Sequence, residues 1–338
     1  MRRQIALTTA ALLICCLALA GCGKQDQQAS ASGEKVKIGF LVKQPEEKWF
    51  QNEWKFADAA GQANGFDVVR IGVKDPDKVL SSIDNLAAQG AKGFVICTPD
   101  VRLGPTIVDK ANQRGLKVIA VDDRFVDTDG KPMENVHYLG IAADEIGKQA
   151  GRALWTEMQK RGWKIEDTAA LVPTRDELET ARKRYEGAIE ELTKAGFPAD
   201  RIFRAPQKTT DVQGGRDAAN IVLTQHGDVK HWLIAGMNDE AVQGAVRATE
   251  NRNIAPDNVV GIGIGDGAVA MIDLAADKPS GFFGSMLISS KRHGKETAEM
   301  LNKWIKDGVE PPMVTLTDAT LITRDNYKQV MKDNGLME

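Results

Sequence analysis

The chain contains few of the residues that support catalysis, metal binding or nucleic-acid binding. Among its 338 residues are four cysteines and four histidines, aromatic residues make up 6%, and the formal net charge is −3. Without a basic patch, the sequence gives no indication of a nucleic-acid partner. Neither G-x-S-x-G, a serine hydrolase motif, nor H-E-x-x-H, a zinc motif, occurs in it. No catalytic residue, metal ion or cofactor is therefore predicted.

The histidines and one cysteine are expected to be structural. His231 begins an apolar strand, and His137, His226 and His293 are expected to be solvated or to cap helices. Cys97 ends an apolar run, where buried packing is the default role of a cysteine. No basic partner that would activate its thiol stands nearby in the sequence.

The N-terminus has the pattern of an export signal. Arg2 and Arg3 precede an apolar stretch over residues 5–20, which is short for a transmembrane helix of ~20 residues and typical of a secretory signal over residues 1–21. The ending Leu-Ala-Gly-Cys resembles the lipobox of bacterial lipoproteins, which implies cleavage before Cys22 and acylation of its sulfur. The polar residues 22–35 are predicted to form a lipidated tether.

The predicted location is therefore the periplasmic side of the cell envelope, with a lipid anchor in a membrane. Ordinary secretion of a soluble product is the alternative. Cys15 and Cys16 leave with the signal, so the exported body keeps a single free cysteine and no intramolecular disulfide.

After the signal, short β-branched runs alternate with longer segments of helical period. The predicted strands span residues 36–42, 66–73, 93–98, 117–123, 137–141, 168–174, 231–237, 259–264, 281–289 and 315–324. The predicted helices span residues 47–63, 78–89, 102–114, 143–161, 178–195, 212–224, 240–251, 268–276, 291–307 and 326–333. Most of the strands are continuously apolar, as parallel strands buried on both faces are. So many strands predict two doubly wound α/β domains with right-handed crossovers.

Polar residues collect where the predicted strands end, which is where open α/β sheets bind ligands. The first such loop carries Lys43, Glu47 and Trp49. Carboxylate and ammonium groups hydrogen-bond hydroxyls, and an indole covers the apolar face of a sugar ring. A solvated, charged start of a helix is the alternative interpretation of this loop.

Two sequence patterns are typical of enzymes, but each is weak evidence for an enzyme here. Asp122 and Asp123 form a possible glycosidase pair, but adjacent residues on an extended strand point to opposite sides. The run 263–268 matches G-x-G-x-x-A, a dinucleotide motif, yet no Asp or Glu follows about 20 residues later. A tight strand-to-helix turn explains its glycines at least as well.

Five separated segments carry a resemblance to a known family: residues 37–50, 90–100, 117–123, 231–239 and 321–326. From about residue 37 to 335 the chain resembles the bacterial L-arabinose-binding periplasmic proteins, sugar-binding proteins of ABC transporters. The resemblance implies the type I periplasmic binding protein fold, with two Rossmann-like domains joined by three crossover strands. The implied N-terminal lobe comprises residues 36–141 and 288–316, and the C-terminal lobe 142–287 and 317–338.

The resemblance also implies roles for individual residues in the N-terminal lobe. Lys43 matches a lysine that donates to the ring oxygen and a hydroxyl, Glu47 a carboxylate that accepts from a hydroxyl, and Trp49 the stacking indole. Asp123 matches the carboxylate that receives the anomeric hydroxyl, with Asp122 beside it. Phe50 and Cys97 match positions that form the apolar wall of the site in the family.

In the C-terminal lobe, Arg184 matches an arginine that forks onto the ring oxygen and a hydroxyl, with Thr180 one helical turn before it. Asn238, preceded by Met237, matches an amide that takes hydroxyls.

Two positions depart from the family pattern and leave the choice of sugar open. Ile141 stands where the family has a methionine near the exocyclic carbon of the sugar. Asp266, next to Gly265, stands where the family has an asparagine, and a carboxylate only accepts hydrogen bonds. L-arabinose is the first expectation, with D-galactose, D-fucose and D-xylose as alternatives.

The implied function is a non-enzymatic receptor that closes on a monosaccharide by hinge motion and delivers it to an ABC membrane permease. Its expected partners are the sugar, the permease and a lipid membrane, and a monomer is the default state. A chemoreceptor, a sugar-active enzyme and a repressor of similar build are the alternatives. A repressor would need a helix-turn-helix head where the signal stands.

Overall fold

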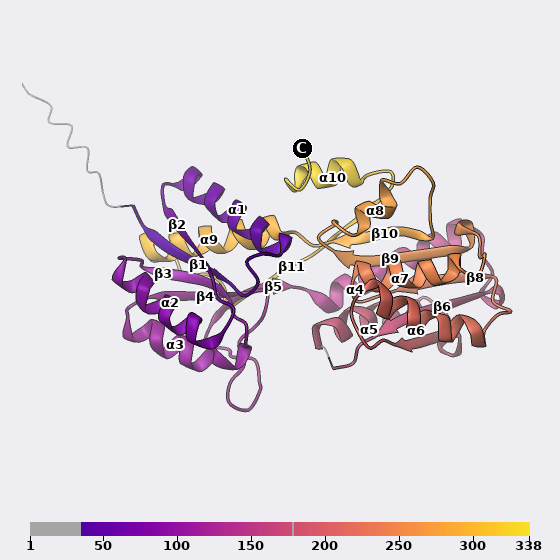
Figure 1. The fold of residues 1–338 in the computed structure, drawn as a ribbon, viewed down its shortest axis with the longest axis horizontal. Helices are drawn as coiled ribbons and strands as arrows, with labels where there is room; N and C mark the ends of the chain where they lie inside the picture. Colours follow the sequence, from indigo (N-terminus) through magenta and orange to yellow (C-terminus); the bar gives the residue numbers. More distant parts are fainter. Residues whose placement is uncertain (1–34, 178) are drawn as a thin grey trace, which may run out of the picture. The chain divides into compact units, whose positions relative to one another are not determined.

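The computed structural model describes residues 35–177 and 179–338 (Figure 1). The predicted signal, Cys22 and nearly all of the predicted tether lie outside the described residues. Within the described part of the chain, no helix is both long and apolar enough to cross a membrane.

The first sheet contains six strands in the order β11-β5-β4-β3-β1-β2, and all neighbouring pairs are parallel. The strands are β1 (Lys37–Val42), β2 (Asp67–Gly72), β3 (Gly93–Cys97), β4 (Lys117–Val121), β5 (His137–Ile141) and β11 (Val314–Thr317). The chain reverses its direction of travel across the sheet between β1 and β3, which places a ligand-binding crevice beyond the carboxyl ends of these strands. We call this sheet and its helices the N-lobe.

The second sheet repeats this order, as β12-β10-β9-β8-β6-β7. Its strands are β6 (Thr168–Thr174), β7 (Ile202–Pro206), β8 (His231–Ala235), β9 (Val259–Gly265), β10 (Phe282–Leu287) and β12 (Thr320–Thr323). Only β12 is antiparallel to its neighbour. The equivalent switch point lies between β6 and β8. We call this sheet and its helices the C-lobe.

Helices cover both faces of each sheet. In the N-lobe, α1 (Lys48–Asn64) and α9 (Ser290–Asp307) pack on one face, and α2 (Pro76–Ala88) and α3 (Gly104–Gln113) on the other. In the C-lobe, α4 (Ala143–Lys160) and α5 (Glu179–Lys194) share one face, and α6 (Val212–Gln225), α7 (Asp239–Glu250), α8 (Ala270–Leu274) and α10 (Tyr327–Asp333) the other. Both faces of each sheet are buried, which explains the continuously apolar strands.

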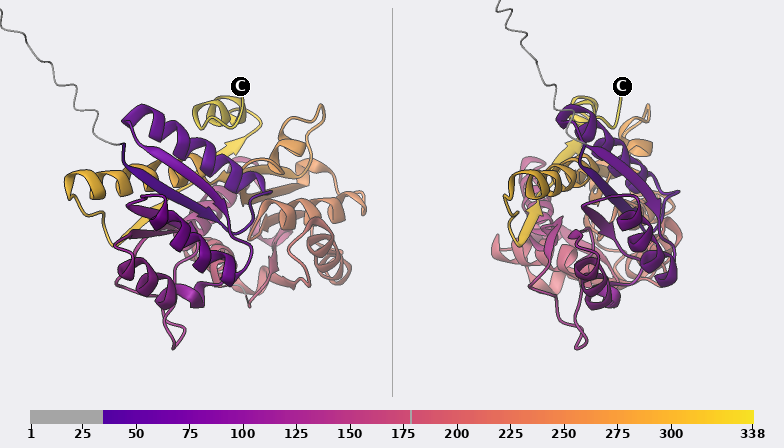
Figure 2. Two further views of the ribbon diagram at one scale, coloured as in Figure 1. Left: turned by 60° about the vertical axis from the view of Figure 1, so that its left-hand side comes forward. Right: turned by 90° about the vertical axis from the view of Figure 1, so that its left-hand side faces the viewer.

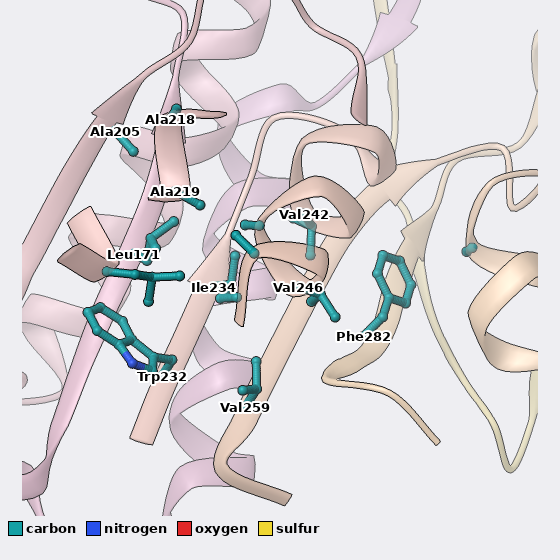
Figure 3. Close-up of a cluster of buried hydrophobic side chains, with 14 of the residues drawn as sticks. Leu171, Ala205, Ala218, Ala219, Trp232, Ile234, Val242, Val246, Val259 and Phe282 are labelled. Carbon is teal, nitrogen blue, oxygen red and sulfur yellow. The ribbon is translucent and has the colours of Figure 1, made fainter. Parts of the chain in front are cut away.

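The core of the C-lobe illustrates this packing. Trp232 on β8 is 1% exposed and packs in one cluster with Leu171, Ile234 and Val242 (Figure 3). Burial of an aromatic or branched side chain of this size contributes about 1.5–3 kcal/mol relative to its exposed state.

The chain passes between the two sheets three times: from β5 to α4, from β10 to α9, and from β11 to β12. Helix α9 is therefore late in the sequence but packs beside α1, which Figure 2 shows as a gold helix among indigo strands. This topology confirms the predicted α/β class.

One observed strand was not predicted, and two predicted strands differ from the structure. Strand β7 was not predicted, because its alternation of polar and apolar residues belongs to a half-exposed sheet edge. The predicted strand over residues 315–324 is two strands, β11 and β12, in different sheets. The predicted strand over residues 117–123 ends at Val121, since Asp122 has a φ of 63° and turns the chain.

Candidate ligand-binding pocket

Residues from the strand ends of both lobes line one pocket of about 480 Å³, a volume within the usual range for small-molecule sites. It brings together most of the side chains that the sequence predicts. Those that line it are Lys43, Trp49, Phe50, Asp122, Asp123, Ile141, Thr180, Arg184, Met237 and Asn238.

Three predicted residues do not line this pocket. Glu47 is exposed and occupies the N-cap position of α1. Cys97 is fully buried behind the wall, where its Sγ lies 3.5 Å from Oδ2 of Asp123. Asp266 is half-buried, and its Oδ1 accepts a hydrogen bond from the backbone N–H of Ala268 at 3.0 Å.

We call the N-lobe side of the pocket the N-wall, comprising Lys43, Trp49, Asp122, Asp123 and His293. An ion pair lies at its edge, with Lys43 Nζ 2.5 Å from Asp123 Oδ2. Burial lowers the pKa of Lys43, but its neighbours Cys97 and Asp123 outweigh that effect and raise the pKa above its ordinary value. The ammonium therefore stays charged at neutral pH.

Asp122 is the centre of the N-wall. Its left-handed backbone directs its carboxylate toward α1 and α9, where Oδ1 lies 2.7 Å from Nδ1 of His293 and Oδ2 accepts from Nε1 of Trp49 at 3.3 Å. The phenol of Tyr138 donates to the backbone carbonyl of Asp122 at 2.8 Å. Burial raises the pKa of Asp122, but the hydrogen bond and charge of His293, together with the hydrogen bond from Trp49, outweigh it and leave the pKa below its usual range.

Both aspartates reach the pocket, so the expectation that they point to opposite sides of a strand is wrong. The expectation assumed an extended backbone at Asp122, but this residue has a positive φ and a left-handed backbone conformation. Each carboxylate already has a cationic or donor partner, Lys43 for Asp123 and His293 for Asp122. The pair is therefore arranged to accept hydrogen bonds rather than to flank a scissile bond.

We call the C-lobe side the C-wall, comprising Thr180, Arg184, Met237 and Asn238. Nη1 of Arg184 donates to the backbone carbonyl of Met237 at 2.8 Å, while its buried Nε has no hydrogen-bond partner among the described residues. Burial lowers the pKa of Arg184 to about 10, against the opposing charge of Asp239. The guanidinium remains charged at neutral pH, with part of its donor capacity unused.

Asp239 lies behind the C-wall at the start of α7 and is 2% exposed. Burial raises its pKa to about 7, with further contributions from Glu240 and Asp266. The carboxylate fits because Gly263 and Gly265 face it: a Cβ at either position would clash with a carboxylate oxygen. These close contacts account for both glycines of the dinucleotide-like motif.

Asn238 is the N-cap of α7. Its Oδ1 accepts from the backbone N–H of Ala241 at 3.0 Å, and its Nδ2 donates to the carbonyl of Thr210 at 2.9 Å. An amide has two N–H donors on nitrogen and two lone pairs on oxygen. One N–H of Nδ2 and one lone pair of Oδ1 therefore remain available for a ligand.

Sequence reasoning missed two residues of the N-wall region. His293 was expected to be solvated or to cap a helix, but it is 0% exposed and lines the pocket. Glu53 is also 0% exposed and lies behind Asp122. Glu53 shares the buried face of α1 with Phe50, and His293 shares that of α9 with Thr297, but no local sequence pattern distinguishes either residue from an exposed polar one.

One group of side chains in the described ranges is close enough to hold a metal ion. Ligand atoms of Glu53, Asp122 and His293 all lie within 4.8 Å of one another. The distance between His293 Nδ1 and Asp122 Oδ1 is that of a hydrogen bond, which the two atoms form without an ion.

Two curated relatives of this chain are both named as L-arabinose-binding periplasmic proteins. The chain is 52% identical over 308 residues to the L-arabinose-binding periplasmic protein of Escherichia coli (strain K12), a match that covers 91% of this chain and 93% of that protein. It is 46% identical over 336 residues to the ABC transporter L-arabinose-binding periplasmic protein of Azospirillum brasilense, covering 99% and 100%.

A solved structure shows the same fold. A periplasmic ribose ABC transporter from Conexibacter woesei matches with a TM-score of 0.71 at 22% identity, covering 88% of this chain and 95% of that one. At this identity the likeness supports the fold alone.

These relatives confirm the predicted resemblance to L-arabinose-binding periplasmic proteins. They also confirm the prediction of a binding protein rather than an enzyme, since both are named for binding. A family profile described as periplasmic binding proteins and the sugar binding domain of the LacI family matches residues 35–330. The chain therefore belongs to the family of periplasmic binding proteins and LacI-type sugar-binding domains.

Proposed function

We propose that this protein is an extracytoplasmic receptor that binds a monosaccharide, with L-arabinose as the first candidate, and delivers it to an ABC permease. The observation that carries the proposal is the convergence of an indole, an ion pair and a partly unpaired guanidinium in one pocket. Trp49 supplies the indole, Lys43 and Asp123 the ion pair, and Arg184 the guanidinium. The two L-arabinose-binding relatives support the choice of sugar.

The pocket chemistry suits a pyranose. One face of such a ring is apolar and matches the indole of Trp49, while its rim carries hydroxyls that both donate and accept. Asp123 accepts from a hydroxyl, and Lys43 and Arg184 donate to hydroxyl or ring oxygens. Hydrogen bonds that involve an ionised partner are roughly twice as strong as neutral ones.

Closure of the two lobes around the sugar is the proposed switch. Desolvating Lys43, Asp123 and Arg184 is unfavourable unless hydroxyls satisfy them, so the closed form is favoured only with a fitting ligand. The three passages of the chain between the sheets are the proposed hinge. Periplasmic binding proteins as a class close around their ligands by hinge motion, so the same motion is expected here.

The sugar and the membrane anchor are the finer parts of the proposal. Ile141 lines the pocket, whereas Asp266 does not, so Ile141 is the residue through which this chain would differ from its relatives in ligand preference. Acylation at Cys22 would tether the receptor to a membrane. Labelling with a radioactive fatty acid, lost in Cys22→Ser, tests the anchor separately from sugar binding.

Calorimetric titration of the body from Gly33 onward with L-arabinose, D-galactose, D-fucose, D-xylose and D-ribose tests the ligand. The expected result is micromolar or tighter binding led by L-arabinose. Tighter binding of another sugar would change the specificity and leave the class intact. Absence of heat with all five sugars would contradict a monosaccharide receptor.

A further inference from the structure

A cluster of three titratable side chains joins two residues of the N-wall, Asp122 and His293, to Glu53 behind them. Glu53 comes from α1, Asp122 from the turn after β4, and His293 from α9. Glu53 and His293 are both 0% exposed. The ring of His293 also contacts the indole of Trp49 edge-on, with centroids 5.2 Å apart. The cluster therefore reaches the pocket through Asp122 and His293, and His293 contacts Trp49.

The packing of α1 against α9 fixes Glu53 in this place. Gly294, next to His293, lies so close to α1 that a Cβ on it would clash with the carbonyl oxygen of Glu53. Neither carboxylate oxygen of Glu53 has a hydrogen-bond partner within the described chain. An ionised carboxylate in this position would be strongly disfavoured, whereas a protonated one can donate to the neighbouring Asp122 carboxylate, whose oxygen lies within 4.8 Å.

The hydrogen bonds of His293 place a proton on its Nδ1. The hydroxyl of Thr317 lies 2.9 Å from Nε2 and 3.3 Å from the carbonyl of Gly140, so its proton can be donated to Nε2 of a neutral ring. A neutral ring with its proton on Nε2 would present a lone pair to Oδ1 of Asp122 at 2.7 Å. The short contact is attractive when Nδ1 carries the proton and donates it to Asp122.

We propose that Glu53, as a protonated acid, and His293, through its Nδ1–H, are positioning residues of the pocket that hold the Asp122 carboxylate and through it the indole of Trp49. This inference rests on the proposed sugar-binding function, because it explains how the stacking surface is held in place. Asp122 Oδ2 is the acceptor of the indole N–H, so any displacement of the carboxylate is transmitted to Trp49.

Protons fit the cluster better than a metal ion. A tetrahedral zinc ion bound at about 2.0–2.1 Å would separate its nitrogen and oxygen ligands by roughly 3.3 Å. The observed separation of 2.7 Å between His293 Nδ1 and Asp122 Oδ1 is that of a charge-assisted hydrogen bond.

The groups around Glu53 determine whether sugar affinity should rise or fall with pH. Burial, together with the charge of Asp122, raises the pKa of Glu53 well above its usual range. The other titratable groups that face the cluster from the neighbouring elements are Lys43, Cys97, Asp123 and Tyr138. Lys43, Cys97 and Tyr138 all have raised pKa values, so Glu53 is the group that loses a proton as the solution becomes alkaline. A second negative charge then repels Asp122, and sugar affinity falls.

The test compares wild type with Glu53→Gln, which keeps the shape and neutrality of the protonated acid. Calorimetric affinities are measured from pH 5.5 to 9.5 with the best-binding sugar of the panel. We expect wild type to lose at least about tenfold in affinity between pH 7 and 9.5. Glu53→Gln should match wild type within about threefold at pH 6 and lose less than threefold by pH 9.5.

Two controls isolate this effect. Glu134→Gln makes the same substitution at an exposed loop residue and should follow wild type. Asp239 on the other side of the pocket titrates near pH 7, so the decisive quantity is the difference between wild type and Glu53→Gln. Identical profiles for these two proteins would overturn the positioning role, and so would a loss of affinity in wild type after exhaustive metal chelation.

A measurement without sugar separates failure of this inference from failure of the proposed function. A buried carboxylic acid has an infrared carbonyl band distinct from that of a carboxylate. We expect this band in the wild-type body at neutral pH and its selective loss in Glu53→Gln. If no sugar bound but the band that Glu53→Gln removes were present, the cluster would stand and the ligand would be wrong; Asp239→Asn identifies the band of the other buried acid. Absence of the band would overturn the protonated cluster itself.

Discussion

The N-wall and the C-wall hold their charged side chains in different ways. On the N-wall, Lys43 is paired with Asp123, and Asp122 is held by His293 and Trp49. On the C-wall, Arg184 is anchored through one nitrogen only, and its Nε is buried without a partner among the described residues.

This difference indicates that the two walls contribute differently to binding. A ligand at the N-wall meets groups whose charges are already compensated, so the wall supplies shape and a fixed stacking surface. A ligand at the C-wall completes hydrogen bonds that the protein leaves unmade, and these carry a larger net gain. The C-wall should therefore be more sensitive to loss of one charged group.

The largest expected effect concerns the buried acid behind the C-wall, Asp239. Its pKa rises from an ordinary value near 4 to about 7, so its contribution to stability is fully present below pH 4 and lost as pH rises through 7. The shift of about three units corresponds to at most about 4 kcal/mol. Asp239→Asn should flatten the fall in the free energy of unfolding between pH 4 and 8.5.

Chemical denaturation at a series of pH values measures this effect. Asp277→Asn, a substitution at an exposed aspartate, serves as the matched control and should retain the wild-type slope. A slope in Asp239→Asn equal to that of wild type would show that the carboxylate is ionised throughout and that Arg184 compensates it fully.

The second effect tests the unpaired guanidinium directly. Arg184→Ala should weaken sugar binding about 100-fold, or about 2.7 kcal/mol, because it removes charged hydrogen bonds. Arg184→Lys should recover only part of this, since an ammonium lacks the planar fork. Arg182→Ala, at an exposed position on the same helix, is the control and should bind sugar as wild type does. Equal affinities of Arg184→Ala and Arg182→Ala would remove the C-wall from the site.

The sequence predicted the repeated α/β order well because buried parallel strands leave an unmistakable apolar pattern. It failed where that pattern is weak. Strand β7 contains Arg204 and Pro206 and lies at the sheet edge, where polar side chains are tolerated. Strands β11 and β12 follow each other with Asp318 and Ala319 between them, so a single run of β-branched residues concealed a passage between the lobes.

The candidate site was predicted from residues that reach out of strand ends, and those that support them from behind were missed. Glu53 and His293 lie on helices that also carry many exposed polar residues, and each was indistinguishable from a surface position by residue type. Only the packing of α1 on α9, which joins residues more than 200 positions apart, shows that both are buried. Contacts of this kind depend on topology and have no local signature.

The third effect tests the stacking surface of the N-wall. Trp49→Ala should weaken binding at least about tenfold, or about 1.4 kcal/mol, because the apolar face of the sugar loses its cover. Trp49→Phe keeps an aromatic face but loses the hydrogen bond from the indole N–H to Asp122. Its affinity for the sugar should therefore lie between those of wild type and Trp49→Ala. Titration calorimetry gives the affinities, and circular dichroism verifies the fold. Lys48→Ala, at the exposed neighbouring residue, is the control and should bind as wild type.

The smallest effects concern the two positions that depart from the family pattern, and they sharpen the comparison of the walls. Ile141 lines the pocket, while Asp266 lies outside the lining and its carboxylate accepts from the backbone N–H of Ala268. Ile141→Met should therefore change the ratio of L-arabinose to D-galactose affinity by about three- to fivefold, because the swap changes the shape of the side chain but nearly conserves its volume, and such swaps usually cost less than about 1.5 kcal/mol. Asp266→Asn should change the same ratio by less than about twofold. The reverse order would mean that Asp266 leaves its turn to reach the sugar, and the C-wall would then extend to the end of β9.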